Sequence, residues 1–292
     1  MSFSADCKNE MCRVPPARAC CARAELYGCL LFGRVFSPGE LRILTAHDGV
    51  AARLTALMDG VYGLRFEIGG QGGKRALYSS GPGDARAVLD GFGYGGEPFV
   101  AVHLNRAVIE DDCCMAALTR GAFLTGGFAA SREYHLELVT PHAALSRELS
   151  ALLSELGLPP KAAQRAGHRV LYYKASESIE DFLTLCGAPL SALSLMEAKV
   201  EKDMRNRVNR KVNCETANSV KAANAAVAQC AAFGRLRGTR GWDKLPDTLR
   251  RAAEARLNFP EDTLSELAGR LGVTKSCLNH RLRRLLEISE NA

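Results

Sequence analysis

Two stretches of this chain decide its fold: CCARAELYGCLLFG at residues 20–33 and CCMAALTRGAFLTG at residues 113–126. Both begin with a Cys-Cys pair, carry apolar residues at helical spacing and end in glycine. Each stretch predicts an apolar helix, and the two lie 93 residues apart. Their likeness indicates that the front part of the chain contains an internal repeat.

The repeat extends beyond these two helices. A second match, at an offset of 95, begins at Leu41 and Leu136, and a third, at an offset of 94, begins at Arg75 and Arg169. Three collinear matches over roughly 75 residues favour a duplicated unit over chance similarity. The predicted repeats cover about 19–95 and 112–190, inside a first domain at 1–198.

Both repeats predict the same order of elements. In the first repeat we expect a helix at 19–33, strands at 35–36 and 41–45, a helix at 48–59, strands at 62–68 and 75–80, and a final helix beginning at 84–89. In the second we expect a helix at 113–126, strands at 127–130 and 134–140, a helix at 143–156, a weak strand within 160–166, a strand at 169–174 and a helix at 177–185. The fold class is therefore α+β, with two αββαββα units in tandem.

Two local features have a structural interpretation. The glycine-rich Gly69–Lys74 lacks the spacing of a phosphate-binding loop and precedes a strand pattern, so we interpret it as a hairpin. His47 and His142 are equivalent positions of the two repeats, which indicates a shared structural role after a strand and not a catalytic pair.

Composition restricts the class of protein. With 292 residues, of which 47% are hydrophobic and 24% charged, the chain is expected to form two domains or slightly more. No apolar run approaches the roughly 18–20 residues of a membrane span, and residues 1–16 carry charges where a signal peptide is apolar. We expect a cytoplasmic protein without a membrane partner.

The 11 cysteines are odd in number, and no export signal accompanies them, which favours reduced thiols over a disulfide framework. The sequence contains no Cys-x-x-Cys motif, and no nearby His pair follows a cysteine. We therefore interpret the cysteines as small packed hydrophobes and expect neither a metal site nor a cofactor.

Charge is distributed unevenly along the chain. Residues 1–198 hold 19 Lys and Arg against 21 Asp and Glu, a net charge of −2, whereas residues 199–292 hold 19 against 11, a net charge of +8. A basic segment of this kind is typical of a surface that neutralises nucleic-acid phosphates and releases their counterions.

The tandem αββαββα units, each entered through a helix that ends in glycine, resemble the LAGLIDADG homing endonucleases. In that family the two signature helices pack together at a pseudo-twofold axis, and each supplies an acidic metal ligand. Alignment with the signature places Leu31, Gly33, Leu124 and Gly126 at the acidic positions. Cleavage of a phosphodiester by divalent cations needs carboxylate ligands, so the resemblance implies the fold but no catalytic residues and no enzyme.

Residues 199–233 predict a basic helical linker, rich in helix formers. Asn is a poor residue inside a helix because its amide competes for backbone partners, so the four Asn between 205 and 221 are expected to cap, to turn or to contact something polar. The residues expected to make nucleic-acid contacts, with capping as the open alternative, are Arg205, Asn209, Arg210, Asn213, Asn218 and Lys221.

Residues 234–292 predict a helix-turn-helix module. A first amphipathic helix covers 248–257, with Pro246 placed where a first helical position would be. Thr263 and Glu266 form a capping box before a short second helix, which Gly272 ends. Thr274 caps a third helix whose apolar face is expected to consist of Leu278, Leu282 and Leu285. Trp242 is expected to anchor the start of the module.

The polar face of the third helix is the candidate DNA-reading surface. Lys and Arg suit guanine, Asn suits adenine, and each bidentate contact contributes about 1–3 kcal/mol of discrimination. The predicted contact residues are Lys275, Ser276, Asn279, His280, Arg281, Arg283 and Arg284. The alternative is a purely structural three-helix unit.

The chain as a whole resembles the WhiA family of Gram-positive sporulation and cell-division regulators. The resemblance covers nearly the whole chain, and its most specific segments are Asn209-Arg210 with residues 213–218, and Lys275-Ser276 with residues 279–283. Cys277 stands where the family's Lys-Ser-Gly run has a small Gly. The resemblance implies a degenerate endonuclease domain joined to a helix-turn-helix that binds double-stranded promoter DNA, a nucleoid-associated location, transcription control of cell-division and sporulation genes, and no cleavage.

Two other functions remain as hypotheses. In the first, the duplicated domain binds a protein partner or a small ligand, and the helix-turn-helix localises this adaptor on DNA. In the second, the chain is a residual metal-dependent nuclease whose acids are recruited from elsewhere, such as Glu25, Asp111 or Asp112.

Overall fold

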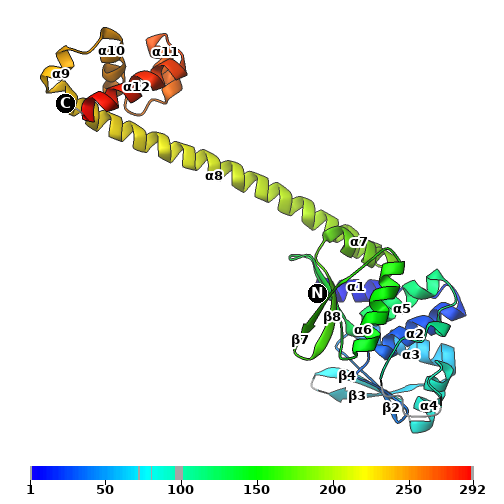
Figure 1. Ribbon diagram of the computed structural model, residues 1–292. Coiled ribbons are helices and arrows are strands. Elements are labelled where there is room, and N and C mark those ends of the chain that lie inside the picture. The colour runs from blue at the N-terminus through cyan, green and yellow to red at the C-terminus, as the bar shows by residue number, and fades with distance from the viewer. Residues whose placement is uncertain (1, 72, 80, 96–100, 291–292) are drawn as a thin grey trace. The chain divides into compact units, whose positions relative to one another are not determined.

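The computed structural model describes residues 2–71, 73–79, 81–95 and 101–290. The chain divides into two compact units, Met1–Lys202 and Asp203–Ala292 (Figure 1). The first unit is mixed α and β, and the second is helical. The α+β fold class that the sequence predicts is confirmed.

The duplicated αββαββα order is confirmed in the first unit. The first repeat consists of α2 (Ala19–Leu31), β1 (Val35–Ser37), β2 (Glu40–Thr45), α3 (Asp48–Tyr62), β3 (Phe66–Gln71), β4 (Lys74–Ser79) and α4 (Pro82–Gly91). The second consists of α5 (Asp112–Gly126), β5 (Gly127–Ala130), β6 (His135–Thr140), α6 (Ala143–Glu155), β7 (Lys161–Arg165), β8 (His168–Tyr173) and α7 (Ser176–Leu185). A short 3-10 turn, η1 (Arg106–Val108), precedes the second repeat.

Each repeat forms one four-stranded antiparallel sheet, with strand orders β1-β2-β4-β3 and β5-β6-β8-β7. The third strand, which is weak in the sequence of the second repeat, is present as β7. In the first repeat the predicted strand 62–68 is shifted, because α3 continues to Tyr62 and Gly63 ends it with a left-handed backbone, φ 66°. Gln71 pairs with Lys74, so the glycine-rich segment is a hairpin as predicted, and Gly72 at its tip lies outside the described residues.

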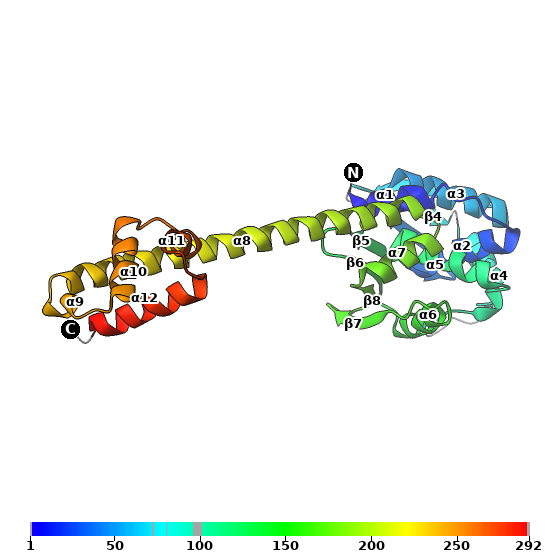
Figure 2. The same cartoon turned by 90° about the horizontal axis from the view of Figure 1, so that it is seen from above.

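The two repeats meet along α2 and α5, which lie side by side in the middle of the first unit (Figures 1 and 2). A Cβ added at Gly28 would lie 2.2 Å from the carbonyl oxygen of Leu118, and one at Gly121 would lie 2.1 Å from the carbonyl oxygen of Glu25. The two backbones are therefore in direct contact, and at these two positions any side chain would push the helices apart.

The N-terminal helix α1 (Phe3–Met11) lies outside the predicted repeats and was not among the predicted elements. Its Glu10 carboxylate accepts hydrogen bonds from the backbone N–H of Leu190 (2.7 Å) and of Ser191 (2.9 Å), and from the Ser191 hydroxyl (2.7 Å). These groups belong to the first turn of α8 (Pro189–Arg237), where unpaired N–H groups and the helix dipole favour a carboxylate.

α8 is one helix of 49 residues, which begins in the first unit and ends in the second. The prediction that the Asn residues cap or turn this segment is wrong, because Asn206, Asn209, Asn213 and Asn218 all lie inside the helix. An Asn in a helix interior costs at most about 0.7 kcal/mol relative to Ala, and residues 190–233 contain neither Gly nor Pro. The summed preference of the surrounding Ala, Lys, Arg and Glu outweighs that cost.

The second unit has the predicted helix-turn-helix elements. α9 (Arg240–Asp243), α10 (Asp247–Asn258), α11 (Leu264–Leu271) and α12 (Lys275–Glu290) follow the end of α8, which lies beside α10 and α12 (Figure 2). Phe233 and Leu236 of α8 and Trp242 of α9 share one core with α10, α11 and α12. The sequence predicts Pro246 at the first helical position of α10. In the structure Pro246 is instead the N-cap residue of that helix.

In the described part of the chain no helix combines the length and the hydropathy that a membrane span needs.

The substitution Gly121→Ala is expected to lower the free energy of unfolding of the first unit by about 3 kcal/mol, because a methyl group cannot occupy a position 2.1 Å from a backbone oxygen without separating α2 from α5. Urea unfolding followed by far-ultraviolet circular dichroism measures the change. Trp242, the single tryptophan, reports on the second unit separately by its fluorescence.

Gly60→Ala is the matched control, since Gly60 also lies in a helix and a Cβ there would meet nothing within 4 Å. This change is expected to leave stability unchanged or to raise it by up to about 1 kcal/mol. Equal stability of the Gly121→Ala variant and the unsubstituted protein would contradict the close-contact explanation.

Candidate nucleic-acid interface

Local hydrogen bonds fix the turn between α11 and α12 and thereby the direction of α12. Thr263 and Glu266 form the predicted capping box: the Thr263 N–H donates to Glu266 Oε2 (2.7 Å), and the Glu266 N–H donates to Thr263 Oγ1 (3.3 Å). The hydrogen bonds from Thr263 lower the pKa of the Glu266 carboxyl. Gly272 ends α11 with φ 63°, and the Cys277 N–H donates to Thr274 Oγ1 (3.2 Å) at the start of α12.

The two faces of α12 differ in the way the sequence predicts. Leu278, Leu282 and Leu285 have no exposed surface and pack into the core of the second unit. Five of the seven predicted DNA-contacting residues are exposed and two are half-buried: Lys275, Ser276, His280, Arg283 and Arg284, then Asn279 and Arg281. Among the described residues, none of the seven side chains has an ion-pair partner, so four cationic side chains on one helix are left uncompensated.

A buried arginine, which was not among the predicted site residues, connects the elements that pack behind α12. Arg256 of α10 is only 3% exposed. Its guanidinium donates to Gln229 Oε1 of α8 (3.0 Å) and to the carbonyl oxygen of Asp262 (2.7 Å) in the connection between α10 and α11. Burial lowers the pKa of Arg256. A buried arginine of this kind has no local sequence signal that names its partners, because they come from two different segments, α8 and the connection after α10.

A second arginine, Arg270, contacts the connection between α10 and α11 from the surface. Arg270 of α11 forms an ion pair with the Asp262 carboxylate (2.6 Å), and its guanidinium carbon lies 3.9 Å from the centre of the Phe259 ring. Together these contacts fix α11 against α10, and α11 in turn fixes the entry into α12. The geometry of the turn thus depends on contacts with α8 and α10 as well as on its own capping residues.

All six predicted linker contacts lie on the surface of α8, within the second unit: Arg205, Asn209, Arg210, Asn213, Asn218 and Lys221. At about 100° per residue, they point over more than half of the circumference of the helix, so they do not form one patch. The Asn218 amide lies 3.6 Å from the Cys214 sulfur, one turn away.

At the positions that the resemblance aligns with acidic metal ligands, the first unit carries no carboxylate. Leu31 and Leu124 are each 1% exposed, and a Cβ at Gly126 would lie 2.5 Å from the Phe32 ring, so these positions contribute packing. No group of three or more carboxylates and histidines lies close enough to ligate one ion in the described part of the chain.

The three acids that could replace those ligands are not available as a group. The carboxylate of Glu25, which is fully buried, accepts hydrogen bonds from Arg53 (2.8 and 2.9 Å) and from Arg120 (3.0 and 2.8 Å). Asp111 forms an ion pair with Arg18, and Asp112 is exposed in the first turn of α5. Breaking the buried Glu25 pairs to hold a cation would leave two arginines without their counter-charge.

His47 and His142 occupy equivalent positions, as the repeat predicts. Each is the N-cap residue of the helix after a strand, α3 and α6 respectively. The N–H of each donates to the hydroxyl of a Thr two residues earlier, at 3.1 and 3.2 Å. Burial lowers the pKa of both imidazoles. This is a shared structural position.

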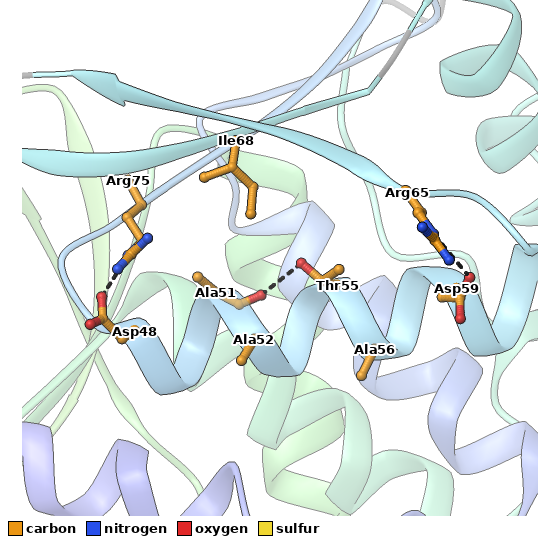
Figure 3. Close-up of a pocket in the computed structure, with 9 residues that line it drawn as sticks. All are labelled: Asp48, Ala51, Ala52, Thr55, Ala56, Asp59, Arg65, Ile68 and Arg75. Atoms are coloured by element: carbon orange, nitrogen blue, oxygen red, sulfur yellow. Dashed lines mark hydrogen bonds and ion pairs between the residues drawn. The ribbon is translucent and has the colours of Figure 1, made fainter.

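A groove of about 600 Å³ lies between α3 and strands β3 and β4 (Figure 3). Its floor is formed by Ala51, Ala52, Ala56 and the Cβ side of Thr55, and Ile68 covers it from β3. The charged residues at its ends are paired with each other, Arg75 with Asp48 (2.5 Å) and Arg65 with Asp59 (3.9 Å). The groove therefore offers an apolar floor with an ion pair at each end.

Family models match parts of both units, and known proteins match nearly the whole chain. The model of the WhiA C-terminal helix-turn-helix domain matches residues 208–289, and that of the WhiA LAGLIDADG-like domain matches residues 115–205. The probable cell division protein WhiA of Alkaliphilus metalliredigens is 33% identical, over 99% of this chain and 98% of the relative. That of Moorella thermoacetica is 38% identical, over 98% of this chain and 90% of the relative.

Solved structures show the same fold. The crystal structure of full-length DUF199/WhiA from Thermatoga maritima superimposes with a TM-score of 0.58 at 21% identity, over 100% of this chain and 99% of that chain. The N-terminal LAGLIDADG domain of DUF199/WhiA matches with a TM-score of 0.50 at 19% identity, over 64% of this chain and 90% of that domain.

Proposed function

The chain belongs to the WhiA family, and on that premise we propose that it is a sequence-specific DNA-binding regulator of transcription that acts on cell-division and sporulation genes. Its relatives carry the name probable cell division protein. The observation that carries the proposal is the polar face of α12, whose cationic side chains have no ion-pair partner in the described chain while the opposite face is fixed in the core.

The proposal assigns α12 to the major groove of double-stranded promoter DNA. An α-helix fits this groove, and the residues near the N-terminus of a recognition helix contact base edges. Asn279 and Arg283 are one turn apart and carry the two side chains best suited to bidentate contacts, Asn with adenine and Arg with guanine. Lys275, Ser276, His280, Arg281 and Arg284 surround them and act on bases or phosphates. A DNA-bound protein of this kind is expected to be cytoplasmic and associated with the nucleoid.

The exposed side chains on α8 extend the proposed interface. Arg205, Arg210 and Lys221 supply positive charge for phosphates, and Asn209, Asn213 and Asn218 supply amides that can donate hydrogen bonds to phosphate oxygens. Because these side chains point in several directions, we assign them to phosphate contacts, which contribute affinity and not sequence preference. The net charge of +8 over residues 199–292 supports this assignment.

We also propose that the first unit does not cleave DNA. A two-metal mechanism needs carboxylate oxygens on both signature helices. The signature positions of this chain carry Leu31, Gly33, Leu124 and Gly126, and Glu25 is held by two arginines. On this proposal the duplicated unit is a scaffold and not a nuclease.

An adaptor role for the first unit is the second candidate, and it is compatible with DNA binding. The observation that favours it is Ile68, which is 56% exposed on the edge strand β3, above the apolar groove of Figure 3. An exposed branched side chain beside an apolar floor is suited to a protein partner or an apolar ligand.

The double substitution Asn279→Ala and Arg283→Ala is expected to weaken binding to cognate promoter DNA by about 100-fold or more, since each bidentate contact contributes about 1–3 kcal/mol. The cognate site is taken from a genome-wide map of DNA occupancy, and affinity is measured by fluorescence anisotropy at fixed salt. Arg235→Ala, which removes an exposed arginine of the same unit, is the control. Undiminished binding by a folded double variant would refute the assignment of α12.

Arg210→Ala is expected to weaken binding to cognate and random DNA alike. If Arg210 contacts one phosphate, the slope of log affinity against log salt concentration becomes less steep by about 0.9, because one counterion fewer is released. Titrations at several salt concentrations measure the slope. An unchanged slope would remove Arg210 from the interface.

Supercoiled plasmid incubated with the protein and Mg²⁺ or Mn²⁺ is expected to stay intact on an agarose gel, at the level of a protein-free control. Nicking that depends on the protein and disappears with EDTA would contradict the scaffold proposal. Loss of such nicking in a Glu25→Gln variant would identify Glu25 as a recruited acid.

A further inference from the structure

Four cysteines meet at the beginning of the helix pair that joins the two repeats. Cys20 and Cys21 lie in the first turn of α2, and Cys113 and Cys114 lie at the equivalent positions of α5. The sulfur atoms of Cys20, Cys21 and Cys114 all lie within 4.8 Å of one another. The sulfur of Cys113 is 3.3 Å from that of Cys21, and it borders this set of three without being within 4.8 Å of all of them.

These distances fit a metal site better than ordinary packing. Tetrahedral zinc with four cysteine ligands has Zn–S distances of about 2.3 Å, which places neighbouring sulfur atoms about 3.8 Å apart. Cys21 and Cys114 are buried, while Cys20 and Cys113 are half-buried, so the group is shielded but reachable from solvent. Apolar packing alone does not require cysteines from both repeats to lie this close together.

The site is also electrostatically prepared for negative charge. Four thiolates around one divalent cation carry a net charge of −2, which burial would destabilise without compensation. The N-termini of α2 and α5 each supply the partial positive charge of a helix dipole. The guanidinium of Arg18, which is also paired with Asp111, places its Nη2 2.7 Å from the Cys113 sulfur.

We propose that Cys20, Cys21, Cys113 and Cys114 bind one Zn²⁺, a divalent cation that prefers thiolate ligands, in a closed structural site that ties the N-terminal ends of α2 and α5 together. Four protein ligands leave no position for water, so the site stabilises and does not catalyse. Binding displaces the thiol protons into solvent and involves no redox step. The spacing rule for zinc motifs misses this site, because each helix contributes two adjacent cysteines and no Cys-x-x-Cys.

The full chain, purified under anaerobic reducing conditions, tests the proposal directly. After incubation with Zn²⁺ and removal of excess metal, elemental analysis is expected to give about one zinc per chain. Incubation with Co²⁺ is expected to give the intense thiolate-to-cobalt charge-transfer absorption and the d–d bands of a tetrahedral sulfur site. This spectrum needs no variant, so it does not depend on how a substitution affects folding.

Two double variants identify the ligands. Cys20→Ser with Cys114→Ser removes one sulfur from each helix and is expected to abolish stoichiometric zinc and to remove the zinc-induced rise in melting temperature. Cys214→Ser with Cys277→Ser, which changes two cysteines of the second unit, is the matched control and is expected to keep both. Circular dichroism of each variant without metal verifies that it is folded.

Three results would overturn the proposal. The first is the absence of stoichiometric zinc and of a tetrahedral cobalt spectrum in the reduced, folded full chain. The second is equal zinc content in the two double variants. The third is a Cys21–Cys113 disulfide, found by mass spectrometry of protein isolated without air, that persists and prevents metal uptake; the cysteine pairs would then form a covalent bridge and not a metal site.

Discussion

The first unit depends on one steric constraint, the direct contact between the backbones of α2 and α5. Gly28 meets the carbonyl of Leu118, and Gly121 meets the carbonyl of Glu25, so each helix fits into the other only where a side chain is missing. This contact brings equivalent positions of the two helices together. The approach of the two cysteine pairs and the pairing of Arg120 with Glu25 across the interface both follow from it.

The α2–α5 pair carries apolar or small residues, and no carboxylates, at the positions that align with the acidic residues of the LAGLIDADG signature. At the signature positions Leu31 and Leu124 are buried, and they add apolar contact where carboxylates would have to be desolvated. The fully buried carboxylate of Glu25, on α2, is compensated by Arg53 and Arg120. A buried carboxylate with two arginine partners is costly to rearrange, and the interface between the repeats is correspondingly specific.

The second unit presents its polar surface by a different principle, since most of its geometry is local. The capping box at Thr263, the left-handed Gly272 and the cap at Thr274 set the turn within about a dozen residues. Long-range contacts then hold that turn, above all Arg256, which joins α8, α10 and the connection to α11. The result is a helix whose apolar side is immobilised in a core and whose cationic side is free to contact a polyanion.

The sequence by itself determined the features that depend on neighbours along the chain: the repeat, nearly all helices and strands, the caps of α11 and α12, and the seven polar residues opposite Leu278, Leu282 and Leu285. Periodicity and capping are local, so they can be read without a fold. The sequence did not reveal α1, the end of α3 at Gly63 or the continuity of α8 through its Asn residues. At these places weak local preferences compete, and the surrounding structure decides. Only the tertiary structure decided which distant groups meet, namely Glu25 with two arginines, Arg256 with Gln229, and the two cysteine pairs with each other, because such contacts join residues far apart in the chain and leave no periodic trace in it.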